Sequence, residues 1–144
     1  MKKIIRLFLA TVIVTTSFAA AFGQLLPESE NISPYYIGTS EVVCDITSAL
    51  GMQLRLYAGL EPKTSASVDD VRITMKVINF VSGGVVQNKT YVAEYNYLTN
   101  YYEAKDTCTA ITPGSYYLQI TYKAYKNGVL LETINQNSTI ISIG

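Results

Sequence analysis

The chain has 144 residues, including twelve tyrosines and two cysteines but no histidine or tryptophan, and its eleven basic and eleven acidic residues give a formal net charge of zero. Without histidine, Ser-His and Cys-His nucleophile systems, histidine zinc sites and imidazole general bases are excluded. Two isolated cysteines are too few for a tetrahedral thiolate zinc site, and no glycine-rich phosphate loop is present, so we predict neither a metal nor a cofactor.

The first 23 residues have the three parts of a secretory signal peptide. Basic residues at the start precede an apolar run from Leu7 to Val14, and small residues at 19–23 close the segment. The strictly apolar run is about half of the roughly 20 residues needed to span a bilayer. We therefore predict cleavage after Gly23, with Ala21 as the second choice, secretion from a bacterial cell, and no stable membrane anchor afterwards.

Cleavage would change the charge of the chain. It removes three basic residues and no acidic ones, which leaves eight basic and eleven acidic residues, a net charge of −3. The eight basic residues are scattered from Arg55 to Lys126 rather than gathered in a stripe. Binding to nucleic acid requires a concentrated positive surface, so we predict no nucleic-acid partner. The 121 remaining residues suit one domain.

Residues 24–40 contain two prolines and no sustained apolar period, and we predict that they form a leader before a folded domain at 41–144. From Glu41 onward, apolar residues recur at every second position, which is the period of a half-buried β-strand. We expect the first three strands over about 42–47, 52–60 and 71–79.

Glycine-containing turns divide the rest of the domain. Gly83-Gly84 and Asn127-Gly128 predict tight hairpins, because these residues tolerate the positive φ values of such turns. The fourth to sixth strands are expected over 85–98, with a break near 87–88, and over 101–108 and 116–125. The seventh strand is expected over 129–134, with an interruption at 135–137 after which it resumes over 138–143.

Seven short strands separated by turns predict an all-β fold, namely a two-sheet antiparallel β-sandwich, with a closed barrel as the alternative. The stretch Pro113-Gly114-Ser115-Tyr116 resembles the entry to strand F of immunoglobulin-like and fibronectin III-like domains, which place a tyrosine near that corner. The chain departs from the antibody pattern, since it has no tryptophan for strand C and its cysteines are not at the strand B and strand F positions.

A second resemblance rests on Gly114-Ser115-Tyr116, Lys126-Asn127-Gly128 and Glu132-Thr133. Together they are similar to elements of small secreted sandwich proteins of Gram-positive bacteria (Firmicutes) to which no function is assigned. This resemblance covers roughly residues 41–143. It implies an immunoglobulin-like fold and an export route, and it brings no catalytic residues.

Cys44 and Cys108 would meet an oxidising exterior in an exported protein. If they form a disulfide, the closed loop of about 64 residues would stabilise the fold by about 4 kcal/mol in the chain-entropy model. Two separate buried thiols are the alternative.

Glu94 and Glu103 flank the predicted turn at Thr99 and Asn100, and in a symmetric hairpin they would lie on neighbouring strands. Glycosidases use two carboxyl groups at short distance to cleave the glycosidic bond. A solvated pair of surface charges is the interpretation we favour, because a sandwich of this size has little room for a deep cleft. We predict that the protein is not an enzyme.

Five tyrosines gather around this turn. In the predicted strand, Tyr91, Tyr95 and Tyr97 share one face, and the adjacent Tyr101 and Tyr102 must point to opposite faces. We favour core packing for the first three, since Glu94 and Asn96 occupy the other face of the strand. An exposed aromatic platform for a protein partner or a sugar is the alternative.

Together these features predict a secreted, non-catalytic binding or interaction module whose partner is an extracellular protein or a polysaccharide. The five tyrosines are its candidate ligand-binding residues. A carbohydrate-binding module is one alternative. A structural, adhesin-type subunit that assembles by strand addition is the other, because sheet edges can template pairing with another chain.

Overall fold

The structure is a computed structural model that describes residues 36–64, 67–109 and 112–144. The predicted signal peptide and residues 24–35 of the predicted leader lie outside the described residues. The described part of the chain contains nine β-strands and no helix, which confirms the all-β prediction. In the same residues there is accordingly no helix long and apolar enough to cross a membrane.

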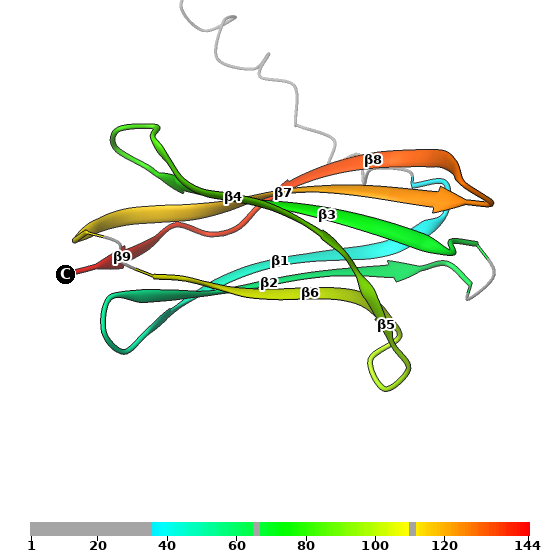
Figure 1. The fold of residues 1–144 in the computed structure, drawn as a ribbon, viewed down its shortest axis with the longest axis horizontal. Helices are drawn as coiled ribbons and strands as arrows, with labels where there is room; N and C mark the ends of the chain where they lie inside the picture. Colours follow the sequence, from blue (N-terminus) through cyan, green and yellow to red (C-terminus); the bar gives the residue numbers. More distant parts are fainter. Residues whose placement is uncertain (1–35, 65–66, 110–111) are drawn as a thin grey trace, which may run out of the picture. The chain divides into compact units, whose positions relative to one another are not determined.

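Two antiparallel sheets are stacked face to face as the layers of a sandwich (Figure 1). Sheet A has the strand order β1-β2-β6-β5, and sheet B has the order β4-β3-β7-β8, with β9 paired to β7. The strands are β1 (Thr39–Ala49), β2 (Gln53–Pro62), β3 (Asp70–Asn79), β4 (Val85–Val92), β5 (Glu94–Asn96), β6 (Tyr101–Cys108), β7 (Gly114–Lys126), β8 (Val129–Asn137) and β9 (Ile141–Ile143).

The core lies between the two sheets and is filled by every second residue of the long strands. Burial of one such apolar side chain contributes about 1.5–3 kcal/mol to folding. The burial of alternate residues confirms the half-buried strands predicted near 52–60, 71–79 and 116–125. The core side chains of β2, β3 and β7 are Leu54, Leu56, Ala58, Leu60, Val71, Ile73, Met75, Val77, Tyr116, Leu118, Ile120, Tyr122 and Ala124.

The two turn signals around β7 have the geometry that their residues predict. Tyr116 is buried at the start of β7, and its hydroxyl donates to the backbone oxygen of Thr112 at 2.5 Å. At the other end of the strand, Asn127 and Gly128 have φ values of 50° and 76° and connect β7 to β8 as a hairpin. Local turn chemistry therefore fixes both ends of this central strand.

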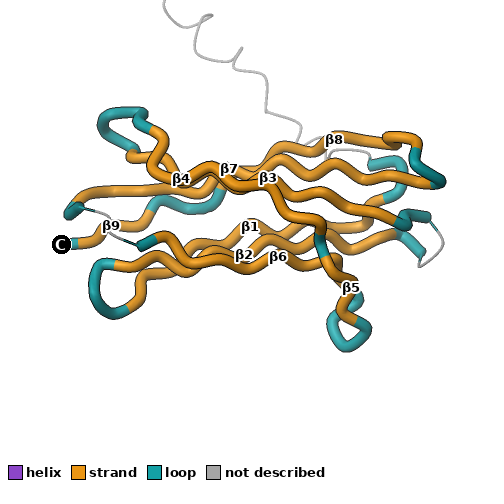
Figure 2. The backbone as a smooth tube through the Cα atoms, in the orientation of Figure 1, coloured by secondary structure: helices purple, strands orange, loops and turns teal. Residues whose placement is uncertain are grey.

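The single strand predicted over 85–98, with a break near 87–88, is wrong. β4 pairs with β3 in sheet B, whereas β5 pairs with β6 in sheet A, and the break falls at Ala93. Ala93 is buried, and its backbone N–H donates to the Val71 oxygen at 2.8 Å. Here the chain crosses from one layer to the other (Figure 2). Period-two alternation cannot reveal this crossing, because it is the same in both sheets.

In the structure both cysteines are free thiols. Cys44 on β1 pairs with Ala58 of β2, and Cys108 on β6 pairs with Leu54 on the opposite side of β2. Two strand spacings and four residues along the strand separate their Cα atoms by roughly 16 Å. A disulfide requires about 7 Å or less, so the alternative of two separate thiols is the observed one.

Glu132 of β8 fastens the beginning of β1 to the opposite sheet. Its carboxylate accepts hydrogen bonds from the backbone N–H groups of Ile37 (2.9 Å) and Gly38 (3.2 Å) and from the hydroxyl of Thr39. Thr39 is buried, and Tyr36 packs against the core. The last residues of the segment predicted as a leader thus belong to the sandwich.

Candidate functional site

The crossing at Ala93 gives the five candidate tyrosines different surroundings. Tyr91 lies on β4, and its hydroxyl donates to the carboxylate of Asp106 on β6. Tyr102 packs against the core, and its hydroxyl donates to the Val68 backbone oxygen at 3.1 Å. These two tyrosines join the layers.

Tyr95 and Tyr97 form the aromatic part of the β5–β6 hairpin. Tyr95 is half-buried, with its ring centroid 4.9 Å from that of Tyr102 and 5.0 Å from that of Tyr97. Tyr97 lies in the turn and is 85% exposed. Because Tyr91 is on another sheet and Tyr97 is in a turn, the predicted common face of Tyr91, Tyr95 and Tyr97 does not exist.

Tyr101 lies on the outer face of sheet A, opposite in direction to Tyr102 as predicted. Its hydroxyl donates to Glu41 at 2.9 Å. The ring covers Gly59 of β2, where an added Cβ atom would approach a ring carbon to 3.0 Å. Gly59 therefore provides the space in which the Tyr101 ring rests on the sheet.

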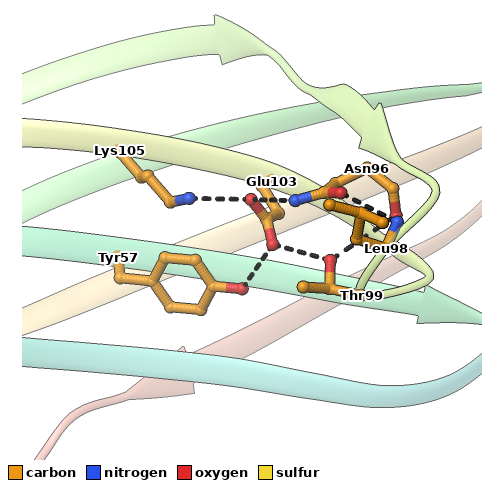
Figure 3. Close-up of polar contacts among 6 residues, drawn as sticks. All are labelled: Tyr57, Asn96, Leu98, Thr99, Glu103 and Lys105. Carbon is orange, nitrogen blue, oxygen red and sulfur yellow. Dashed lines mark hydrogen bonds and ion pairs between the residues drawn. The ribbon is translucent and has the colours of Figure 1, made fainter.

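Glu103 is the polar centre of the same face (Figure 3). One carboxylate oxygen accepts from the hydroxyls of Thr99 (2.8 Å) and Tyr57 (3.1 Å), and the other accepts from Lys105 Nζ (2.9 Å) and Asn96 Nδ2 (3.3 Å). The hydrogen bond from Lys105, followed by those from the other three donors, lowers the pKa of Glu103 to about 2 against the opposing effect of burial.

Tyr57 shows the reciprocal effect. Burial, and then its hydrogen bond to Glu103, raise the pKa of Tyr57 to about 12. Lys105 also lies over the Tyr57 ring, with Nζ 5.4 Å from the ring centroid. The ammonium group is thus held by the carboxylate and the ring together, which fixes its position on the sheet surface.

Glu94 pairs directly with Glu103 across β5 and β6, so these carboxylates lie on neighbouring strands as predicted. A glycosidase needs one carboxyl group that keeps its proton near neutral pH. Glu103 has a pKa of about 2 and is ionised under those conditions. Glu103 is therefore suited to accepting hydrogen bonds rather than to donating a proton.

A shallow hollow of about 620 Å³ opens beside this cluster, between the end of β4 and the β5–β6 hairpin. At its rim, Leu98 is 95% exposed and Val92 is also exposed. Three of the candidate tyrosines line the hollow, whereas Tyr101 and Tyr102 do not. The lining residues are Tyr91, Val92, Glu94, Tyr95, Asn96, Tyr97, Leu98, Glu103, Ala104 and Lys105.

The chain matches no protein-family model and no curated protein sequence. The chemistry of the hollow must therefore be read from its own residues. In the described ranges, no group of three or more histidine, cysteine, aspartate or glutamate side chains is placed to hold a metal ion. What the hollow offers is an exposed aromatic ring, exposed aliphatic groups and a set of fixed hydrogen-bonding groups.

The sequence pattern singled out Tyr91, Tyr95 and Tyr97, which line the hollow, but it did not indicate the Glu103 cluster. The alternation of Tyr101, Glu103 and Lys105 on β6 was a usable signal that the three share one face. The position of Tyr57 beside Glu103 could not be predicted from the sequence. It depends on the pairing of β2 with β6, and no local pattern encodes that pairing.

Proposed function

We propose that the protein is a secreted, non-catalytic binding module built on an immunoglobulin-like β-sandwich. The order β1-β2-β6-β5 corresponds to strands A-B-E-D of such a domain, and β3-β7-β8 corresponds to C-F-G, with β4 as an added strand beside C. The hydrogen bond from Tyr116 to Thr112 supports this assignment, because a tyrosine at the start of strand F bonds back to the chain in the same way.

The observation that carries the function is the combination of the exposed Tyr97–Leu98 tip with the fixed Glu103 cluster beside it. A few side chains supply most of the free energy of binding at protein interfaces, and tyrosine is enriched among them. The hairpin projects from the body of sheet A, so a partner can reach it (Figure 1). We infer an extracellular protein as the partner.

A polysaccharide is the second candidate. Glu94, Asn96 and Lys105 line the same hollow as Tyr97. Sugars present hydroxyl groups for such polar side chains and a C–H face for an aromatic ring. This arrangement favours a carbohydrate over a purely apolar small molecule.

The test uses the mature chain, residues 24–144, against panels of immobilised extracellular proteins and insoluble polysaccharides. Wild-type protein is expected to be retained on at least one surface, and Tyr97→Ala is expected to weaken that retention at least tenfold. Val81→Ala is the control, because Val81 is as exposed as Tyr97 but lies in the β3–β4 loop. Retention on no surface would refute the proposal, as would hydrolysis of glycosides or esters that is lost in Glu103→Gln.

A further inference from the structure

The loop between β3 and β4 presents apolar side chains and no charge. No charged residue occurs from Ile78 to Gln87. Val81 is 86% exposed, and Phe80, Val85 and Val86 are exposed as well. Neighbouring exposed apolar side chains of this kind are found where a protein contacts a membrane or another protein.

The backbone N–H groups of this loop are all paired within the protein. Every N–H group from Phe80 to Gly84 donates to an acceptor within the protein, so none would be stranded without a partner in an apolar environment. The pairs are Phe80 with the Ser115 oxygen (2.8 Å), Val81 and Ser82 with Asn79 Oδ1 (3.1 and 2.9 Å), Gly83 with the Asn79 oxygen (2.9 Å) and Gly84 with Ser82 Oγ (3.2 Å).

The outer face of sheet B carries three basic side chains. Arg72 of β3 and Lys123 of β7 are directly opposite each other, and Lys76 lies on the same face of β3 nearer to the loop. Asp70 forms an ion pair with Arg72 at 3.4 Å, so Arg72 is already neutralised, at the end of β3 that is far from the loop. Lys76 and Lys123 are then the basic side chains of this face that can contact an external anion.

The loop and the basic face lie on the same side of the molecule. In Figure 1 the β3–β4 loop rises at the upper left on the outer side of sheet B, whereas the β5–β6 hairpin projects downward from sheet A. An apolar tip beside a basic surface is the arrangement by which peripheral proteins attach to membranes that contain anionic lipids.

We propose that the β3–β4 loop and the outer face of sheet B bind a lipid surface with anionic headgroups. Phe80 and Val81 enter the boundary between headgroups and acyl chains, and Lys76 and Lys123 contact the lipid phosphates. Attachment is reversible and needs neither a spanning segment nor a covalent lipid. The β5–β6 hairpin points away from the membrane and stays accessible to its own ligand.

The experiment is co-sedimentation of the mature protein with vesicles of phosphatidylcholine alone and of phosphatidylcholine with phosphatidylglycerol at 3:1. Wild-type protein is expected to bind the anionic vesicles more tightly and to be released by salt. Val81→Asp is expected to weaken binding at least tenfold. Each of Lys76→Gln and Lys123→Gln is expected to weaken binding to anionic vesicles about fivefold, the effect of about 1 kcal/mol per basic residue.

Leu98→Asp is the matched control, since it places the same charge on an equally exposed side chain of the opposite hairpin. This variant is expected to bind vesicles like the wild type, and thermal melting verifies that every variant is folded. The proposal is overturned if wild-type protein stays in the supernatant with both vesicles. It is also overturned if Leu98→Asp and Val81→Asp lose binding equally.

Discussion

At the scale of single residues, Glu94 and Glu103 show that neighbouring side chains determine what a carboxylate contributes to the fold. They face each other across β5 and β6, and both are glutamates in the same hairpin. Glu103 is held by Tyr57, Thr99, Asn96 and Lys105, whereas Glu94 is exposed. The two carboxylates therefore differ in their contribution to the fold although the sequence gives them equivalent positions around the turn.

We expect Glu103→Gln to lower the free energy of unfolding at pH 7 by about 1 to 3 kcal/mol, because charge-assisted hydrogen bonds are lost. The pKa of Glu103 is lowered from 4.5 to about 2, so its carboxylate stabilises the fold above pH 4.5, and this contribution disappears as the pH falls towards 2. Urea denaturation at a series of pH values should show the difference between wild type and variant shrinking over that range.

Glu94→Gln is the control for this titration and should change stability by less than about 0.5 kcal/mol, as is usual for a surface substitution. A constant difference between wild type and Glu103→Gln down to pH 2 would contradict the assigned role of the carboxylate. Asp106 has a lowered pKa too: its burial raises the value, but hydrogen bonds from Tyr91 and Lys89 outweigh that effect. Some acid sensitivity will therefore remain in the variant.

At the scale of elements, the segment from β4 to β5 decides where the site lies. β4 extends sheet B beside β3, and after Ala93 the chain pairs with β6 of sheet A. The hollow is bounded by residues of both strands, so it exists because the chain changes sheets at this point. A continuous strand over 85–98 would leave the tyrosines in one row on one sheet.

Ala93→Pro should destabilise the protein by about 2 kcal/mol, because proline removes the N–H that donates to the Val71 oxygen and leaves that oxygen unpaired. Ala93→Ser keeps the N–H group and nearly the same size, and it is the control. Urea denaturation measures both variants, and hydrogen exchange reports whether the β5–β6 pairing opens first. Equal stability of the proline and serine variants would rule out this hydrogen bond as the anchor of the crossing.

At the scale of the whole molecule, the sandwich is held by its core and by contacts between the layers rather than by a covalent cross-link. The hydroxyl of Tyr122 on β7 donates to the Val43 oxygen on β1, and Glu132 of β8 holds the start of β1. Tyr91 connects β4 to Asp106 of β6 at the other edge. Polar contacts thus link the two sheets at both edges of the core.

Because the two thiols are separate, a reductant should leave the melting temperature unchanged. Thiol titration of the unfolded, unreduced protein should find two thiols per chain. In the folded protein the reaction should be slow at neutral pH, since burial and then Asp45 raise the pKa of Cys44 to about 12, and burial raises that of Cys108. Absence of thiol after unfolding without reductant would contradict the separate positions of Cys44 and Cys108.

The sequence by itself determined the all-β class, the inward phase of β2, β3 and β7 and the turn at Asn127-Gly128. These features depend on residues close together in the chain: alternation reports which side of a strand is buried, and turn residues report their own φ values. The corner at Tyr116 belongs to the same group, because its hydrogen bond spans four residues.

Only the tertiary structure decided the features that depend on which strands become neighbours. It separated Cys44 from Cys108, moved the chain between sheets at Ala93 and placed Tyr57 beside Glu103. It also gathered Arg72, Lys76 and Lys123, which are scattered along the sequence, on one face. The physical reason is that a period of two is the same in every strand, so it specifies a buried side but not the partner strand.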